Sequence, residues 1–170
     1  KGIVVGDLID VVGMDDSTLV HRDGRENFAR IVRRLPRDTT LRRTADDADP
    51  VERVIVANAD QLAVVVATTH PQPRTGLIDR ALIAAFDAGI TPLLILTKTD
   101  LAPATELMAL YEPLGLPVVE VANKEVTTHV RDLFAGHRTV LIGHSGVGKS
   151  TMVNALVPDA ERTTGGVNEV

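Results

Sequence analysis

Beyond residue 60 the chain alternates between short, continuous apolar runs and longer segments with helical spacing. The apolar runs are rich in β-branched residues and have the length of buried strands, as in 62–68 (LAVVVAT). The predicted strands are 62–68, 92–96, 117–121 and 139–142, and the predicted helices are 76–88, 104–114, 126–134 and 149–157. Buried strands that alternate with helices predict an α/β fold with a doubly wound, mainly parallel sheet covered on both faces. In such folds, ligands bind at the carboxyl ends of the strands.

The first 50 residues follow a different pattern, in which short apolar runs are separated by glycines and aspartates. The runs are 3–5, 8–12, 18–20 and 28–32. This punctuation is typical of a small antiparallel sheet or barrel. The acidic stretch 46–52, which contains Pro50, is interpreted as a linker. We therefore expect a small β domain with its linker over residues 1–50 and an α/β domain over 51–170.

Arginines are concentrated at the end of the β domain. Between positions 30 and 43 the arginines are Arg30, Arg33, Arg34, Arg37, Arg42 and Arg43, against one acid, Asp38. The whole chain is acidic, with a formal net charge of -5, so this cluster is a local feature. It is either a solvated strand face or a patch that contacts RNA phosphates.

Composition narrows the class of protein. The 170 residues include no cysteine, which excludes disulfides and cysteine zinc sites within them, and the five histidines lack ligand spacing. Aromatic residues make up only 2%, which argues against a nucleic-acid reader built on base stacking. No apolar run reaches the ~18 residues of a membrane helix, so we expect a cytoplasmic protein with no membrane partner.

A phosphate-binding loop follows the predicted strand 139–142. Residues 143–150 fit the pattern G-x-x-x-x-G-K-[ST], with a helix after them. The residues expected to bind the phosphates are Gly143, His144, Ser145, Gly146, Val147, Gly148, Lys149, Ser150 and Thr151. Lys149 is expected to stabilise phosphate charge and the Ser150 hydroxyl to ligate Mg²⁺. The alternative is an ordinary glycine-rich turn, and His144 either flanks the phosphates or points to solvent.

A second motif follows the predicted strand 92–96. Thr97, Lys98, Thr99 and Asp100 form the Thr version of the element [NT]-K-x-D, which reads guanine. A carboxylate accepts hydrogen bonds from N1–H and the exocyclic amine of guanine, whereas adenine presents an acceptor at N1. The aliphatic stem of Lys98 can lie over the base. The alternative is that Asp100 merely caps a helix.

A fainter element follows the predicted strand 117–121. Ala122, Asn123 and Lys124 stand where GTPases often have an S-A-K-like turn that contacts the guanine oxygen through a backbone amide. Only Lys124 matches that tripeptide, so Ala122 and Asn123 are candidates by position. A plain loop is the alternative.

The order of these motifs separates the chain from most GTPases, in which the phosphate loop comes first. Here 42 residues lie between Asp100 and Gly143, and the base reader precedes the phosphate loop. This circularly permuted order, after a small β domain, resembles the ribosome small-subunit-dependent GTPase A family (RsgA, also called YjeQ). The stretches 5–7 (VGD), 30–43 and 54–66 are similar to that family too.

The resemblance implies a GTPase that converts GTP to GDP and phosphate during maturation of the small ribosomal subunit. It implies bound GTP or GDP with Mg²⁺, and the small subunit and its rRNA as partners. We expect a monomer. Residues 1–50 would be the second part of an OB-like β-barrel. The chain starts at Lys1 rather than Met, and the family's zinc domain is expected beyond Val170. The water-positioning residues are expected either outside this chain or from the ribosome.

Two other functions remain open at this point. One is a nucleotide-switched RNA-binding module whose hydrolysis is incidental. The other is an ATP-using enzyme with a phosphate loop, against which the guanine-reading motif at 97–100 argues.

Overall fold

The computed structural model of this chain describes residues 2–13, 29–46, 49–157 and 160. Its contacts divide the chain into two compact units, Lys1–Asn58 and Ala59–Val170. Each unit is described by itself below.

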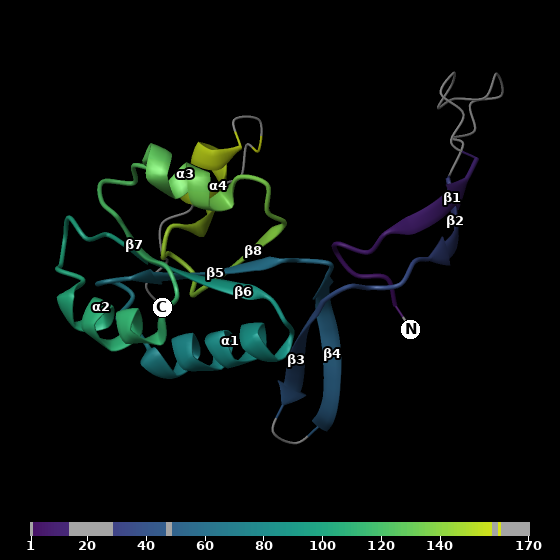
Figure 1. The fold of residues 1–170 in the computed structure, drawn as a ribbon, viewed down its shortest axis with the longest axis horizontal. Helices are drawn as coiled ribbons and strands as arrows, with labels where there is room; N and C mark the ends of the chain where they lie inside the picture. Colours follow the sequence, from purple (N-terminus) through teal and green to yellow (C-terminus); the bar gives the residue numbers. More distant parts are fainter. Residues whose placement is uncertain (1, 14–28, 47–48, 158–159, 161–170) are drawn as a thin grey trace. The chain divides into compact units, whose positions relative to one another are not determined.

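The second unit is built on a parallel sheet. Its strands are β5 (Gln61–Ala67), β6 (Thr91–Thr97), β7 (Val118–Val121) and β8 (Thr139–Ile142), in the order β7-β6-β5-β8 (Figure 1). All three pairings are parallel, which confirms the sheet expected from the apolar runs. The central strand β5 is buried along its entire length because it has a neighbour on each side and a helix layer on each face.

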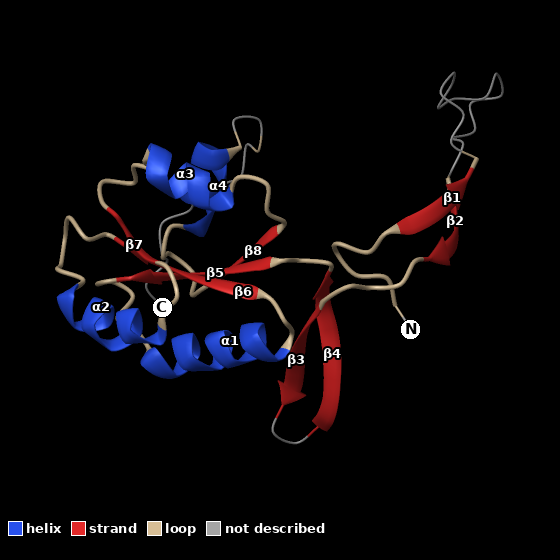
Figure 2. Cartoon of the chain, in the orientation of Figure 1, coloured by secondary structure: helices blue, strands red, loops and turns tan. Residues whose placement is uncertain are grey.

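Helices cover both faces of this sheet (Figure 2). The helices are α1 (Thr75–Asp87), α2 (Thr105–Tyr111) with a 3₁₀ turn η1 (Glu112–Leu114), α3 (Thr128–Phe134) and α4 (Lys149–Leu156). Val65 and Ile95 pack with Val130 of α3 and Met152 of α4 on one face. Alternate strand residues turn to the opposite face, where α1 and α2 lie. Burying each large aliphatic side chain contributes about 1.5–3 kcal/mol, so this core anchors the loops at the sheet's edges.

The described part of the first unit contains two antiparallel strand pairs. Strand β1 (Ile9–Val12) pairs with β2 (Arg30–Arg34), and β3 (Thr40–Asp46) pairs with β4 (Asp49–Ala57). The expected strand 18–20 lies outside the described residues. Interpreting 46–52 as a linker is wrong, because β-branched residues of β4 pair with β3 and the pairing continues into that acidic stretch. Residues 51–57 therefore belong to the first unit.

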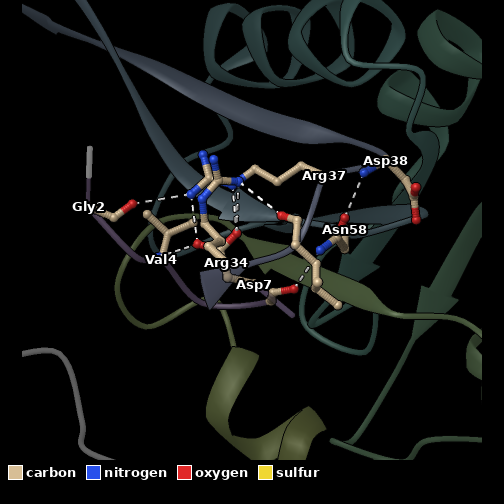
Figure 3. Close-up of polar contacts among 9 residues, drawn as sticks. Gly2, Val4, Asp7, Arg34, Arg37, Asp38 and Asn58 are labelled. Carbon is tan, nitrogen blue, oxygen red and sulfur yellow. Dashed lines mark hydrogen bonds and ion pairs between the residues drawn. The ribbon is translucent and has the colours of Figure 1, made fainter. Parts of the chain in front are cut away.

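A buried ion pair organises the start of the chain (Figure 3). Arg37 donates from Nε to Asp7 Oδ1 at 2.6 Å and from Nη2 to Oδ2 at 2.7 Å. The amide of Val4 donates to the same carboxylate at 2.8 Å, and the Asp7 side chain has 0% exposure. Because hydrogen bonding by Arg37 favours the ionised carboxylate, the pKa of Asp7 falls to about 2 from its ordinary 3.8.

Asn58, the last residue of the first unit, ties two loops together. Its side chain donates to the carbonyl oxygen of Gly6 at 2.9 Å and accepts from the amide of Asp38 at 2.8 Å. A Cβ at Gly6 would lie 1.9 Å from the carbonyl oxygen of Ala57, and the φ of Gly6 is +87°. Only glycine therefore fits at this position.

The Asp7 pKa sets a pH window for the stability of the first unit. Because the pKa is lower in the folded chain than in the unfolded one, the ion pair stabilises the fold fully above pH 3.8. This stabilisation is lost as the pH falls through about 2. We expect the wild type to lose more stability than Asp7→Asn between these pH values, measured by denaturant unfolding.

The matched control is Asp38→Asn, because Asp38 contributes its backbone amide rather than its carboxylate to the contact with Asn58. Its acid unfolding should follow the wild type. Identical acid profiles for wild type and Asp7→Asn would contradict a stabilising role for the Asp7–Arg37 pair.

Candidate functional site

The predicted nucleotide motifs meet at one edge of the parallel sheet. Residues 97–100 follow β6, residues 122–124 follow β7, and residues 143–150 follow β8. Because these strands run parallel, their carboxyl ends and the loops after them lie at the same edge. The loop after β5, residues 68–74, lies there as well.

The phosphate loop passes close to the central strand. A Cβ at Gly143 would lie 2.2 Å from the carbonyl oxygen of Val65, so no larger residue fits without moving β5. The φ values of Gly146 and Gly148 are +77° and +101°, which are left-handed conformations. Helix α4 then begins at Lys149, so its amino end faces the loop. This arrangement of backbone amides and a helix terminus favours an anion.

The side chain of Lys149 folds back over the loop. Its Nζ donates to the carbonyl oxygens of Gly143 at 2.8 Å and His144 at 2.6 Å. Burial lowers the pKa of Lys149, and in the described part of the chain no carboxylate forms an ion pair with it. A bound phosphate would supply that missing negative charge.

Ser150 is half-buried next to Lys149, and both line a cavity of about 680 Å³. The remaining lining residues come from α3, β8, α4 and the segments that follow the two helices, and they include the apolar Phe134, Leu141 and Val153. The Ser150 hydroxyl is an oxygen ligand of the kind that Mg²⁺ accepts, and Ser150 follows directly after Lys149. A hydroxyl directly after a buried ammonium therefore fits a magnesium-bound phosphate, whereas no residue of the loop 143–148 lines the cavity itself.

Thr97 connects the predicted base-reading motif to the predicted phosphate loop. It is only 6% exposed, and its Oγ1 donates to the carbonyl oxygen of Val147 at 2.7 Å. The carbonyl oxygen of Val66 lies 3.3 Å from the same hydroxyl. The Thr97 hydroxyl thus contacts the carboxyl end of β5 and the loop 143–148, and it fixes their positions relative to each other.

Lys98 to Leu101 form the turn that presents Asp100. Lys98 has a φ of +60°, and its carbonyl oxygen accepts from the amide of Leu101 at 2.9 Å. Asp100 is exposed, and its Oδ1 accepts from the amide of Asn123 at 2.8 Å. Asp100 does not cap α2, because that helix begins at Thr105 with Ala104 at its N-cap and no side-chain cap. The helix-cap alternative is therefore wrong.

The turn after β7 is tightly wound. Asn123 and Lys124 both have left-handed φ values, +49° and +62°, and the amide of Glu125 donates to the carbonyl oxygen of Ala122 at 2.9 Å. This geometry directs the amide of Asn123 to Asp100. The two turns that were expected to surround a guanine are thus hydrogen-bonded to each other.

Two features of the β5–α1 loop were not anticipated from the sequence. Thr68 Oγ1 donates to the carbonyl oxygen of Lys98 at 2.9 Å, and Lys98 Nζ donates to the carbonyl oxygen of His70. The only signal for Thr68 in the sequence is a hydroxyl at the end of a buried strand. Of the two alternatives for His144, the one in which it points to solvent is wrong, because its Nε2 is buried in a narrow gap that Pro71 and Arg74 line.

The candidate RNA-binding arginines lie in the first unit and differ in how exposed and how paired their side chains are. The side chain of Arg37 is 15% exposed and is held by Asp7, and Arg34 lies 3.9 Å from the same carboxylate. Arg33 is 68% exposed and pairs with Asp10 at 2.6 Å. Of the remaining candidates, Arg30 and Arg42 are exposed, whereas the side chain of Arg43 is outside the described part.

Among the residues that the structure describes, no three His, Cys, Asp or Glu side chains gather to hold a metal ion. Within the same residues, no helix has the length and apolar character needed to cross a bilayer.

Comparison with known proteins places the chain in a family. The family model described as RsgA GTPase matches residues 34–170, which include the base-reading turn, the turn after β7 and the phosphate loop. The chain belongs to the RsgA GTPase family. This membership confirms the resemblance inferred from the permuted motif order.

Relatives of this family support the assignment. The small ribosomal subunit biogenesis GTPase RsgA of Pseudomonas syringae pv. syringae is 42% identical over 160 residues, which cover 89% of this chain and 46% of that protein. The protein of the same name from Pseudomonas aeruginosa strain PAO1 is 39% identical over 160 residues, with the same shares covered. The chain thus spans about half the length of the curated relatives it matches.

Two solved structures share the fold. YjeQ from Thermotoga maritima superposes with a TM-score of 0.66 and 25% identity, over 93% of this chain and 52% of that one. YloQ, described as a circularly permuted GTPase, superposes with a TM-score of 0.62 and 25% identity, over 94% and 52%. A circularly permuted GTPase, the arrangement expected from the motif order, is therefore among the structures that resemble this one.

The approach of the phosphate loop to β5 makes Gly143 sensitive to substitution. Gly143→Ala places a methyl group 2.2 Å from the carbonyl oxygen of Val65. We expect a loss of about 2 kcal/mol or more in the free energy of unfolding, because overpacking forces the backbone apart. Nucleotide binding should weaken as the loop moves, as titration calorimetry would show.

Gly76→Ala is the matched control, because a Cβ there meets no atom within 4 Å and the residue lies in α1. Alanine should stabilise that helix by about 0.5–1 kcal/mol. If Gly143→Ala unfolded like Gly76→Ala, the tight passage between the loop and β5 would not exist in solution.

The lowered pKa of Lys149 predicts a proton linkage. Because burial favours the neutral amine and a bound phosphate favours the ammonium, nucleotide binding should raise this pKa. At a pH between the lowered pKa of Lys149 and the ordinary lysine value of 10.5, binding should be accompanied by proton uptake. Calorimetry in buffers of different ionisation enthalpy measures the number of protons taken up.

Lys149→Arg provides the comparison, since a guanidinium stays charged at this pH and takes up no proton. The linkage to Lys149 would be disproved by equal proton uptake in wild type and Lys149→Arg.

Proposed function

We propose that the full-length protein is a GTPase that hydrolyses GTP to GDP and phosphate during biogenesis of the small ribosomal subunit. The observation that carries this proposal is the Thr97 hydrogen bond to Val147, which joins an exposed guanine-type carboxylate turn to a phosphate loop. The names of the relatives, small ribosomal subunit biogenesis GTPase RsgA, supply the process and the partner.

The phosphate loop is proposed to bind the β- and γ-phosphates. Backbone amides of residues 143–148, the Lys149 ammonium and the amino end of α4 all favour negative charge at one place. Ser150 would ligate Mg²⁺, and Thr151 would stand beside it in the first turn of α4. When bound, Mg²⁺ neutralises charge on the phosphates.

Asp100 is proposed to select guanine. Its carboxylate accepts only, so it suits the N1–H and the 2-amine of guanine and is repelled by N1 of adenine. The bond to the Asn123 amide holds this carboxylate between two turns, and no described residue donates to its Oδ2. This geometry favours GTP over the ATP-using alternative.

The contribution of this chain to hydrolysis is positioning and charge stabilisation. Lys149 is the catalytic residue that we assign here, because it would touch the transferred phosphate. The described residues offer no side chain placed to orient the attacking water. That group is proposed to come from the rest of the protein or from the ribosome, which in GTPases lowers the barrier by about 4–7 kcal/mol.

Ribosomal RNA is the proposed partner of the first unit. The protein is proposed to be a monomer in the cytoplasm. Arg30 and Arg33 are exposed and are the proposed phosphate contacts, and Arg33 also pairs with Asp10, whereas Arg37 is held by Asp7. We further propose that this unit is part of an OB-like barrel. Val5 is 78% exposed and Ile31 is 45% exposed, and apolar side chains this exposed support a barrel in which further strands would cover them.

A zinc domain is proposed for the portion of the protein outside this chain.

The test is turnover by the full-length protein with isolated ribosomal subunits. We expect slow GTP hydrolysis alone, strong stimulation by small subunits, and little response to large ones. Asp100→Asn should lower GTP affinity by roughly 30- to 1000-fold, as expected for loss of a charged bidentate contact. The stimulated activity should then move to xanthosine triphosphate, whose extra carbonyl accepts from the new amide.

Two outcomes separate the alternatives. Turnover that ignores small subunits at low salt would contradict the ribosomal proposal, and binding without stimulated turnover would favour the RNA-binding module with incidental hydrolysis. Arg30→Glu with Arg33→Glu should reduce the stimulation but leave GTP affinity intact, because these arginines lie in the first unit. Unchanged stimulation would remove them from the RNA contact.

A further inference from the structure

The loop between β5 and α1 contacts Lys98 of the base-reading turn in two places, at its backbone and at the end of its side chain. Thr68 Oγ1 donates to the Lys98 carbonyl oxygen at 2.9 Å, and the Thr68 amide donates to the Thr97 carbonyl oxygen at 2.9 Å. At the far end, Lys98 Nζ donates to the carbonyl oxygen of His70. The backbone and the ammonium of Lys98 are therefore both held by residues 68–70.

Lys98 needs such support because its backbone is in an unfavourable conformation. Its φ is +60°, where a side chain crowds the following carbonyl. Its carbonyl oxygen also accepts from the Leu101 amide at 2.9 Å, which closes the turn that carries Asp100. The Thr68 hydroxyl and this turn thus converge on the same oxygen atom.

We propose that Thr68 is a positioning residue that determines guanine specificity. By fixing the Lys98 carbonyl, its hydroxyl sets the direction of the Lys98 stem and, through the turn, the direction of the Asp100 carboxylate. Thr68 does not touch the base itself and acts through Lys98. This inference rests on the proposed function, in which Asp100 reads guanine.

The test compares base preference in the full-length protein and its variants. Thr68→Val removes the hydroxyl but keeps the shape, Thr68→Ser keeps the hydroxyl, and Thr69→Val is the neighbouring control. The Thr69 side chain makes no hydrogen bond to another described residue. Dissociation constants are measured for GDP and for inosine diphosphate, which lacks the 2-amine of guanine, together with thermal unfolding.

We expect Thr68→Val to weaken GDP binding by about 3- to 10-fold, the equivalent of one hydrogen bond. Inosine diphosphate should lose less affinity, because a displaced Asp100 forfeits the 2-amine contact that only guanine offers. The preference for GDP over inosine diphosphate should therefore shrink. Thr68→Ser should restore it, and Thr69→Val should match the wild type.

The outcomes distinguish this inference from the proposed function. A wild type without preference for guanine would overturn the proposed function. A wild type that prefers GDP, beside a Thr68→Val variant with the same preference ratio, would overturn the role of Thr68 alone. Equal weakening for both nucleotides would also overturn it, because it indicates only a general loss of structure. If Thr68→Val does not fold, Thr68→Ala is judged by the same ratio.

Discussion

The hydrogen bond between the Thr97 hydroxyl and the Val147 carbonyl oxygen joins the two chemical halves of the site. The two residues are 50 positions apart in the chain, and both are buried. Removing the hydroxyl would leave a buried carbonyl without a donor, which costs about 1–3 kcal/mol. Because Val147 belongs to the core on the α3 and α4 face, the same bond connects the base-reading turn to the packing of the sheet.

Around this bond, hydrogen bonds within the chain already position the residues of the candidate site without a nucleotide. Lys149 already lies over the loop carbonyls, and Asp100 is already tied to the turn after β7. Groups that keep their positions on binding avoid much of the entropic cost of ordering. The burial that lowers the Lys149 pKa also means that a phosphate there would meet a poorly solvated ammonium, where charge interactions are strong.

The arginines of the first unit differ in what they do. Part of the arginine cluster stabilises the fold: Arg37 neutralises the buried Asp7, which would otherwise be a costly isolated charge. Arg30 stays exposed and available for a partner. A single stretch of sequence therefore contains both structural and candidate binding arginines, and counting charges does not separate them.

Much of this protein followed from its sequence alone. The strand 139–142 was predicted with the bounds that β8 has, and the parallel sheet, both nucleotide motifs and their permuted order identified the family. These features depend on local spacing: apolar runs, glycines in a loop, and a lysine beside a helix start. The pairing of β3 with β4, the Arg37–Asp7 bond and the support of Lys98 by Thr68 came only from the tertiary structure. The last two join residues 30 positions apart, and no local pattern records which distant partner a side chain will meet when the chain folds.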